Sequence, residues 1–245
     1  MKIVGIIPAR YSSSRLPGKP LLLVRGKPMI QRVYEQSKKS KLVNDVIVAT
    51  DDNRIYDCVK NFGGEVVMTS VKHRSGTDRV YEVIKNIKCE IVVNIQGDEP
   101  FIDPANIDKA VNPLLKDRSF NVSTLAVKIN EVRDLMDENK VKVVFDKNYF
   151  ALYFSRSCIP YDLNYNNSKT LDLKKNNYYK HVGLYAYRKN YLLRFSNLKV
   201  SYLENIEKLE QLRILEDGEK IKVVITKKDS FSIDTKSDLE LINKL

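Results

Sequence analysis

Histidine, cysteine and long hydrophobic runs are scarce in this sequence of 245 residues. Its two histidines, His73 and His181, are too few for a histidine-rich metal site. The cysteines Cys58, Cys89 and Cys158 are odd in number and widely spaced, which argues against a disulfide framework and a cysteine-based metal site. Any metal would therefore depend on carboxylates, and magnesium is the expected cation. The cysteine content is typical of a cytoplasmic protein.

No apolar run is long enough to cross a membrane. Runs such as IVGII and EIVVNI are far shorter than the roughly 18 to 20 residues that a spanning helix requires. The N-terminal segment MKIVGIIPAR is interrupted by Pro8 and Arg10, and no small-residue cleavage site follows it. We expect a first β-strand there, with no signal peptide and no membrane insertion.

The overall balance is that of a folded protein with a strong positive charge. Hydrophobic residues make up 43% and charged residues 30%, which leaves little room for extensive disorder. The net charge of +11 comes from lysines spread along the chain, and no dense basic tail is present. Small anionic substrates explain the local basic clusters better than nucleic acid does, so no nucleic-acid partner is expected.

Apolar, β-branched runs alternate with segments of helical periodicity. This alternation predicts an α/β fold with a doubly wound, mostly parallel sheet, in a single domain that carries an inserted lobe. The predicted strands lie at 2–8, 45–51, 65–69, 90–96, 122–127, 141–145, 181–187 and 222–226. The predicted helices lie at 28–40, 53–62, 78–87, 104–116 and 201–218, with a final helix starting near Lys236. The polar stretch 161–177 is predicted to be an exposed, mobile loop.

Several predicted strands end in polar residues. PAR follows IVGII, TDD follows VIVA, and QGDEP follows IVVNI. In doubly wound sheets, ligands bind outside the carboxyl ends of the strands. The functional residues are therefore expected at that edge.

The segment IPARYSSSRLPGKP, residues 7–20, places Arg10, Arg15 and Lys19 in a turn after the first strand. Arginine gives bidentate geometry to phosphate oxygens, and lysine supplies a compact charge. The segment lacks the P-loop and dinucleotide-binding patterns. From the residues alone, a phosphate site and a charged surface loop are equally good interpretations.

Two acids follow apolar runs. Asp98 lies in NIQGDEP, and Asp234 lies in SIDT before the final predicted helix. Magnesium commonly takes one or two carboxylates together with substrate phosphates. The alternatives are a turn built from Gly97 and Asp98, and a helix N-cap at Asp234. A metal that bridges both acids to a triphosphate is expected only if both face one cleft.

Nine segments carry a resemblance to a known family. They are IPARYSSSRLPGKP at 7–20, GKPMI at 26–30, ATDD at 49–52, HRSGTDR at 73–79, NIQGDEP at 94–100, ALYFSRSCIP at 151–160, KHVGLYAYR at 180–188, LEQLR at 209–213 and IDTKSDL at 233–239. In these segments, which follow the same order through nearly the whole chain, the sequence resembles the 3-deoxy-manno-octulosonate cytidylyltransferases, or CMP-Kdo synthetases.

The resemblance implies an activity and a mode of assembly. It implies transfer of a cytidylyl group from CTP to the sugar acid Kdo, with release of pyrophosphate, for lipopolysaccharide or capsule synthesis. It also implies a Rossmann-like fold of the nucleotidyltransferase type, magnesium as cofactor, and a homodimer. Residues from about 120 to 190 would contribute sugar-binding and dimerisation elements.

The resemblance further implies roles for particular residues. Arg10, Lys19 and Asp98 would be catalytic, and Asp98 and Asp234 would bind magnesium. The CTP-binding set would be Pro8, Ala9, Arg10, Arg15, Lys19, Ser75, Gly76 and Gln96. The sugar-acid-binding set would be Arg156, His181, Tyr185, Glu210 and Gln211. Ser232, Lys236 and Cys158 depart from the family pattern, which usually has glycine, proline and proline there.

Three alternatives remain open from the sequence. The acceptor could be an amino-substituted Kdo or another nonulosonic acid. The chain could instead bind a nucleotide without catalysing transfer. It could also be a basic nucleic-acid binder, whose binding to a duplex would depend on salt.

Overall fold

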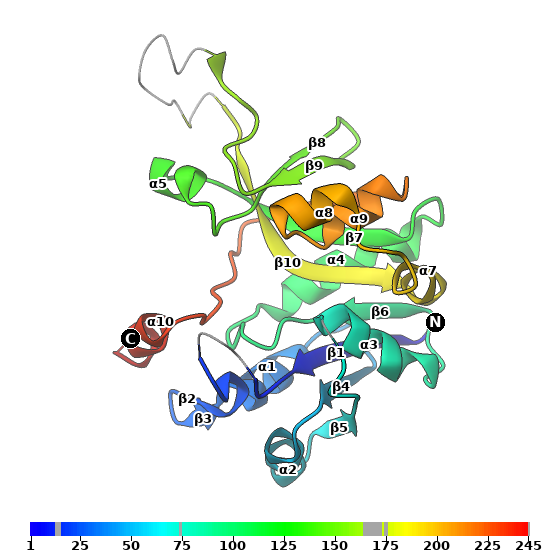
Figure 1. Cartoon of the computed structure of the whole chain (residues 1–245), viewed down its shortest axis with the longest axis vertical. Coiled ribbons are helices and arrows are strands. Elements are labelled where there is room, and N and C mark those ends of the chain that lie inside the picture. Colours follow the sequence, from blue (N-terminus) through cyan, green and yellow to red (C-terminus); the bar gives the residue numbers. More distant parts are fainter. Residues whose placement is uncertain (13–15, 74, 164–172, 174–175, 245) are drawn as a thin grey trace.

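A mixed, mostly parallel β-sheet runs through the molecule (Figure 1). The computed structural model describes residues 1–12, 16–73, 75–163, 173 and 176–244. These residues form nine strands of one sheet, in the order β11-β7-β10-β6-β1-β4-β5, with β8 paired to β10 and β9 paired to β8. The strands are β1 (Ile3–Ala9), β4 (Asp45–Thr50), β5 (Glu65–Met68), β6 (Ile91–Asn94), β7 (Val122–Lys128), β8 (Lys142–Phe145), β9 (Ala151–Ser155), β10 (Tyr179–Arg188) and β11 (Ile221–Thr226).

Strand β1 lies at the point where the chain reverses its direction of winding. From β1 the chain builds β4 and β5 on one side and then returns to place β6 on the other. These four strands are parallel, as are β7 and β11, whereas β10 runs antiparallel to β6, β7 and β8. The predicted mostly parallel α/β sheet is confirmed. The crevice outside the carboxyl ends of β1 and β6 is the place where such sheets bind ligands.

Helices cover both faces of the sheet, so its central strands are buried on both sides. Ile6 and Ile7, neighbours in β1, are both fully buried but belong to different hydrophobic cores. This is the reason why β1 reads as a continuous apolar run. One face packs against α1 (Met29–Ser37), α2 (Asn53–Asn61) and α4 (Pro104–Lys116). The other packs against α3 (Gly76–Lys85), α7 (Lys189–Phe195) and α9 (Gln211–Glu216).

The predicted single helix over 201–218 is wrong. The segment forms α8 (Tyr202–Glu207) and α9, separated by a turn in which Lys208 adopts the left-handed conformation with φ 54°. The apolar residues at helical spacing in this segment do not share one buried face, because Ile206 is 63% exposed while Leu212 is fully buried. These residues are Leu203, Ile206, Leu209, Leu212 and Leu215. The guanidinium of Arg213 donates two 2.7 Å hydrogen bonds to the Glu204 carboxylate, which ties α9 back onto α8.

Two further differences concern the lobe beyond residue 120. Strand β9 and the short helix α5 (Val132–Met136) were not predicted. Most of the predicted loop at 161–177, residues 164–172 and 174–175, lies outside the described residues. In the described part of the chain, the helices are too short or too polar to cross a bilayer.

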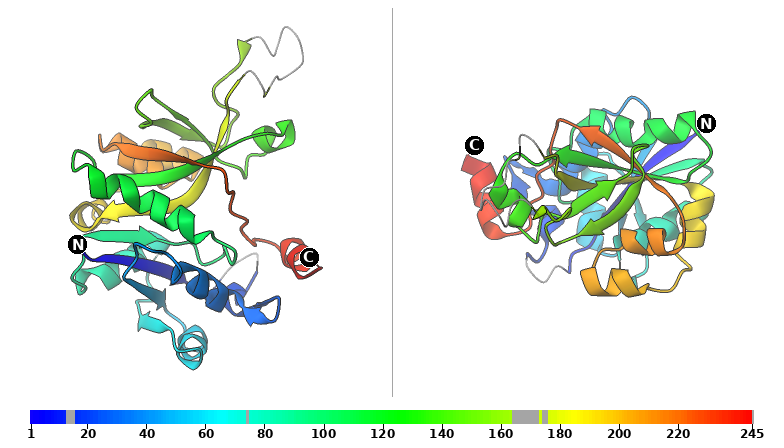
Figure 2. Two further views of the ribbon diagram at one scale, coloured as in Figure 1. Left: turned by 180° about the vertical axis from the view of Figure 1, so that it is seen from behind. Right: turned by 90° about the horizontal axis from the view of Figure 1, so that it is seen from above.

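The C-terminal segment returns to the N-terminal part of the chain. Figure 2 shows α10 (Lys236–Lys244) beyond the sheet, at the end of an extended segment. It packs on the hairpin of β2 (Leu23–Val24) and β3 (Lys27–Pro28), where Arg25 N–H donates to Asn243 Oδ1 at 2.7 Å. Ile233 is fully buried beside Val24 and donates its N–H to the Asp98 carbonyl at 3.0 Å. The residue that follows it, Asp234, is thereby fixed next to Asp98.

Candidate active site

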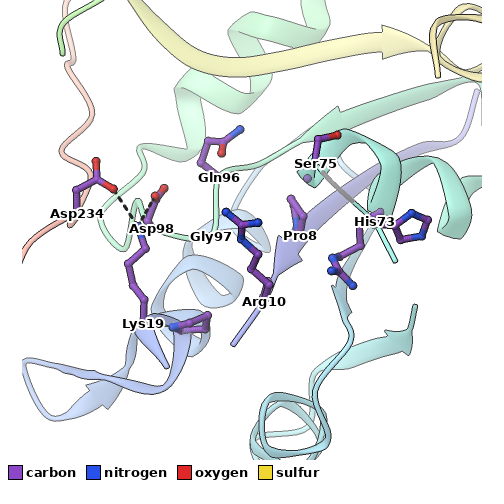
Figure 3. Close-up of a pocket in the computed structure, with 13 residues that line it drawn as sticks. Pro8, Arg10, Lys19, His73, Ser75, Gln96, Gly97, Asp98 and Asp234 are labelled. Atoms are coloured by element: carbon purple, nitrogen blue, oxygen red, sulfur yellow. Dashed lines mark hydrogen bonds and ion pairs between the residues drawn. The ribbon is translucent and has the colours of Figure 1, made fainter. Parts of the chain in front are cut away.

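A cavity of about 280 Å³ lies at the carboxyl ends of β1 and β6 (Figure 3). We call it the first cavity. It collects residues from the first strand, the loop after it, the start of α3, the loop after β6 and the C-terminal segment. Its lining comprises Pro8, Ala9, Arg10, Lys19, Pro20, His73, Ser75, Gly76, Arg79, Gln96, Gly97, Asp98 and Asp234.

Two glycines allow the loops to approach this cavity closely. A Cβ atom on Gly97 would lie 2.9 Å from the Pro8 carbonyl oxygen, so only glycine lets the loop after β6 pack on the end of β1. Gly18 has φ +67° and lies against the Tyr11 ring, and its N–H donates to the Tyr11 carbonyl at 3.0 Å. The tight turn at Gly18 places Lys19 at the start of a short 3-10 helix that faces the cavity.

The N-terminus of α3 forms another wall. Ser75 and Asp78 make a capping box, in which the Ser75 hydroxyl accepts from Asp78 N–H at 3.1 Å. The remaining N–H groups of this helix start and its dipole favour an anion. His73, just before it, pairs with Glu82, which also accepts from Ser70 N–H at 2.9 Å. These contacts hold Ser70 and His73 against α3.

Asp98 and Asp234 converge on one cation. The Lys19 ammonium lies 2.7 Å from Asp98 Oδ2 and 3.1 Å from Asp234 Oδ1, as the dashed lines in Figure 3 show. Two acids far apart in the sequence therefore face one cleft, which was the condition set by the sequence. The N-cap alternative for Asp234 is not the arrangement found, because Thr235 Oγ1 accepts from Asp238 N–H at the start of α10.

The donor set at this point fits a magnesium ion. In the described part of the chain, no third histidine, cysteine or acid joins the pair to make a larger cluster. Two carboxylates that leave the remaining positions to phosphate oxygens and water are the arrangement that magnesium commonly adopts. The Lys19 ammonium already demonstrates that a cation can sit between them.

A second cavity, of about 250 Å³, adjoins the first. The two share Gly76 and Gln96, which form a common wall. The second cavity lies over the sheet face formed by β6 and β10 and is closed by the N-terminal ends of α3 and α9. Its lining comprises Gly76, Thr77, Asn94, Gln96, Val141, His181, Gly183, Tyr185, Tyr187, Phe195, Leu209, Glu210, Gln211 and Ile214.

His181 presents a neutral ring to the second cavity. Its Nε2 lies 2.9 Å from Thr124 Oγ1, and its ring packs against Phe154 and Tyr185. Burial, with a smaller contribution from Lys180, lowers the pKa of His181 to about 3. Near neutral pH the imidazole therefore offers one donor and one acceptor.

Glu210 and Gln211 line the second cavity because α8 ends before them and a turn separates it from α9. Glu210 is the N-cap residue of α9, and its Oε2 accepts from Thr77 Oγ1 at 2.8 Å. Burial raises the pKa of the Glu210 carboxyl above its ordinary value. A continuous helix, as predicted for 201–218, would not have placed a turn at this edge of the cavity.

The structure brings together most of the predicted site residues. Those expected from the sequence for CTP and metal in the first cavity are Pro8, Ala9, Arg10, Lys19, Ser75, Gly76, Gln96, Asp98 and Asp234. Those expected for the sugar acid in the second cavity are His181, Tyr185, Glu210 and Gln211. Arg15 lies outside the described residues.

Arg156 is the predicted residue that the described structure does not place in either lining. Its Nε donates to the Glu207 carbonyl at 2.8 Å and its second guanidinium nitrogen donates to the Glu138 carbonyl at 3.1 Å. In this arrangement Arg156 supports the end of α8, two residues before Leu209 of the cavity wall. Its contact with a sugar acid stays a prediction.

Sequence reasoning missed Thr77, Arg79 and Asn94 as lining residues. Thr77 and Arg79 belong to the quoted segment HRSGTDR, and Asn94 opens NIQGDEP, so a signal was present. Arg79 is nearly fully buried and pairs with Asp51 at 2.7 Å, which ties the loop after β4 to the first cavity.

Comparison with protein families and curated sequences gives consistent matches. A family model described as cytidylyltransferase matches residues 4–221. The 3-deoxy-manno-octulosonate cytidylyltransferase of Geotalea daltonii is 50% identical, with 99% of this chain and 97% of that protein covered. The protein of the same name from Thermodesulfovibrio yellowstonii is 49% identical, with 100% and 98% covered.

Solved structures extend the comparison to three dimensions. A CMP:2-keto-3-deoxy-manno-octonic acid synthetase complexed with CTP superimposes with a TM-score of 0.93 at 43% identity, and 100% of this chain and 98% of that chain are covered. A cytidylyltransferase from Leptospira borgpetersenii gives a TM-score of 0.64 at 18% identity, with 99% and 85% covered. The second likeness concerns the fold alone.

Proposed function

The chain belongs to the 3-deoxy-manno-octulosonate cytidylyltransferase family, and we propose that it transfers a cytidylyl group from CTP to 3-deoxy-manno-octulosonate (Kdo) and releases pyrophosphate. The observation that carries this proposal is the pair of adjoining cavities that share Gly76 and Gln96. One has cationic and acidic residues for a nucleoside triphosphate, and the other has polar groups, among them His181, Glu210 and Gln211, for a sugar acid.

In the first cavity, each group has a task that its position supports. Pro8, Ala9 and the start of α3 at Ser75 and Gly76 form a narrow, small-residue wall suited to the cytosine ring. Arg10 and Lys19 offset the charge of the phosphates, and that charge grows on the leaving pyrophosphate during transfer.

The transfer itself needs no covalent enzyme intermediate. The anomeric hydroxyl oxygen of the acceptor attacks the α-phosphorus in line, and the bond from that phosphorus to the bridging oxygen of pyrophosphate breaks. The hydroxyl proton passes to solvent. Such chemistry depends mainly on positioning and electrostatics, which two cavities with a common wall provide.

Asp98 and Asp234 are the residues that would hold magnesium. When bound, magnesium supplies charge neutralisation and orientation of the phosphate oxygens. In the structure the Lys19 ammonium contacts both acids. We expect the ammonium of Lys19 to leave them for the triphosphate, so that the nucleotide and the metal bind cooperatively.

A panel of acceptors with radiolabelled CTP tests the function. The enzyme is incubated with magnesium, CTP and Kdo, 8-amino-Kdo or sialic acid in turn, and the labelled products are separated. We expect labelled CMP-Kdo as the main product. Preference for 8-amino-Kdo or sialic acid would change the assigned acceptor and leave the cytidylyl-transfer reaction the same. Binding of CTP without any product from the panel would indicate a nucleotide-binding protein.

The proposal includes a cytoplasmic homodimer. Leu152 on β9 and Tyr202 and Ile206 on α8 are large apolar side chains that are more than half exposed, which supports a contact with a second copy. All three cysteines are free thiols, as is typical of a reducing compartment. Light scattering after size-exclusion chromatography should give twice the mass of the 28.3 kDa chain.

A further inference from the structure

Two residues that line the second cavity each carry a buried polar atom without a hydrogen-bond partner. In the described part of the chain, three buried side-chain oxygen or nitrogen atoms lack one: Asn94 Oδ1, the Tyr185 hydroxyl and the Tyr191 hydroxyl. Asn94 is 5% exposed and Tyr185 is 8% exposed, and both line the second cavity. Such atoms are rare in folded proteins, and each one calls for an explanation.

The sheet places these two groups side by side. Asn94 ends β6, and Tyr185 is its partner in the antiparallel pairing with β10. Strand alternation turns Asn94 to the same face as Val92, whose neighbours include Tyr185 and Tyr187. Together they form the sheet side of the cavity, opposite Glu210 and Gln211.

The chemistry of the two atoms defines what they can bind. A side-chain amide oxygen only accepts hydrogen bonds, whereas a phenol both donates and accepts. Burial raises the pKa of Tyr185 well above its ordinary value, so its hydroxyl keeps its proton. A ligand that satisfies both atoms must offer a donor to Asn94 and a polar oxygen to Tyr185, as a sugar hydroxyl does.

The position of Asn94 relates this pair to the reaction. Asn94 lies two residues before Gln96, which lines both cavities. An acceptor whose anomeric oxygen is at the shared wall therefore extends its other hydroxyls over the sheet at Asn94.

We propose that Asn94 is a specificity-determining residue whose amide oxygen accepts a hydrogen bond from a hydroxyl of the acceptor sugar, beside the Tyr185 hydroxyl. This inference rests on the proposed function and adds to it a residue that selects the acceptor. A site that hydrogen-bonds a substrate hydroxyl rejects an analogue lacking it far more strongly than an apolar pocket rejects a changed methylene.

The buried, unpartnered amide oxygen of Asn94 lowers the stability of the protein when no ligand is bound. A buried acceptor without a partner destabilises the fold until the ligand supplies one. Asn94→Leu keeps a similar volume and removes that acceptor. We expect the variant to melt at the same temperature as the wild type or higher. A merely structural asparagine would give a lower melting temperature.

Steady-state kinetics of the full chain with CTP, magnesium and Kdo provide the functional readout. We expect Asn94→Leu to raise the KM for Kdo by roughly 10-fold to 100-fold and to leave the KM for CTP within about 2-fold, because one buried hydrogen bond is lost in the second cavity only. Asn94→Ser, a second variant in case the leucine variant folds poorly, should shift the same KM in the same direction.

Deoxygenated acceptors identify the contact. A panel of mono-deoxy Kdo analogues should contain one that wild type uses at least about 10-fold less well than Kdo and that Asn94→Leu uses as well as Kdo. Tyr191→Phe is the matched control, because it removes the other unpartnered buried hydroxyl, which lines neither cavity. Its KM values should equal those of the wild type.

Two results would overturn the proposal for Asn94. One is an equal rise of both KM values together with a lower melting temperature, which indicates a structural role. The other is that Asn94→Leu and wild type lose the same factor on every deoxy analogue. These results can be distinguished from failure of the proposed function, because in that case the wild type would release no pyrophosphate with Kdo.

Discussion

At the scale of single residues, the ammonium group of Lys19 lies between Asp98 and Asp234, where the proposed magnesium ion would bind. Partly exposed ion pairs are individually weak, but both must be given up before a metal can bind. We expect Lys19→Met to bind Mn²⁺ about 3-fold to 10-fold more tightly than the wild type in the absence of nucleotide, as measured by electron paramagnetic resonance.

The control for this measurement is Lys27→Met. Lys27 pairs with Glu35 at 2.9 Å on the surface and is half exposed, so its removal should leave Mn²⁺ binding unchanged. If Lys19→Met binds Mn²⁺ as tightly as the wild type or more weakly, the Lys19 ammonium does not compete with the metal for the two acids. Turnover with CTP should nevertheless fall in Lys19→Met, since the phosphates lose a cation.

Asp98→Asn tests the acid that the structure places closest to the Lys19 ammonium. The substitution keeps the shape and removes a charge that, in the proposed mechanism, would hold the cation at the reacting phosphates, so we expect turnover to fall by about 100-fold or more. Asp217→Asn is the matched control, because Asp217 pairs with Arg194 away from both cavities. Near-normal turnover of Asp98→Asn would end the assignment of this residue as a metal ligand.

Residue types and their order made Lys19, Asp98 and Asp234 candidates, because charged groups after apolar strands stand out in a sequence. Their roles were implied by the family resemblance, since a surface loop, a turn and a helix cap explained the same residues equally well. Asn94 was not predicted, since its importance depends on the lack of a hydrogen-bond partner after folding. For Arg156 the residue type was visible in the sequence, but the position of its side chain was not. Its contacts with the Glu207 and Glu138 carbonyls depend on how α8 ends.

At the scale of elements, the turn between α8 and α9 decides the shape of the second cavity. The spacing of apolar residues over 201–218 predicts one helix. Periodicity alone cannot reveal that Lys208, within this segment, adopts the left-handed backbone conformation. The turn at Lys208 sets Leu209, Glu210 and Gln211 at the cavity wall. Strand β9 was likewise missed, since a short apolar run such as ALYFS does not by periodicity alone distinguish a strand from a helix segment.

Substitutions at Lys208 test this turn. Left-handed backbone costs a residue with a Cβ about 1 to 2 kcal/mol, and a β-branched residue is especially unsuited to it. We expect Lys208→Val to lower the free energy of unfolding by about 1 to 2 kcal/mol and to raise the KM for Kdo. Lys208→Gly should stay within about 1 kcal/mol of the wild type, because relief of strain offsets the greater freedom of the unfolded chain.

Both variants lose the same 2.9 Å hydrogen bond from the Lys208 ammonium to Asn205, so they differ only in backbone preference. Chemical denaturation and initial-rate kinetics provide the two readouts. Equal stability and equal KM for the valine and glycine variants would mean that the turn does not depend on the left-handed residue.

At the scale of the whole molecule, the alternation of strands and helices predicted the layers of the fold, and all eight predicted strands are present. The direction of β10 was not readable, because an apolar run such as HVGLYAY is equally consistent with parallel and antiparallel pairing. The approach of Asp234 to Asp98 depended on the C-terminal segment packing onto the β2–β3 hairpin, which no local pattern indicates.

The stability of the whole fold should depend on His181 in acid. Its pKa is about 3 in the folded protein and near 6.5 in the unfolded chain, so the unfolded state binds more protons between these values. The stabilisation that comes from the neutral ring is complete above pH 6.5 and is lost as the pH falls towards 3. Urea denaturation at pH 7, 5 and 4 should show a shallower decline for His181→Gln than for wild type, and parallel curves would contradict this.

Release of pyrophosphate is the most direct measurement of the proposed reaction. The purified chain is assayed with CTP, Kdo and magnesium together, and then with each of them omitted in turn. Release only in the complete mixture, in an amount equal to the CMP-Kdo formed, is the predicted result. No release in the complete mixture, or the same release without Kdo, would contradict the transfer of a cytidylyl group between the two cavities.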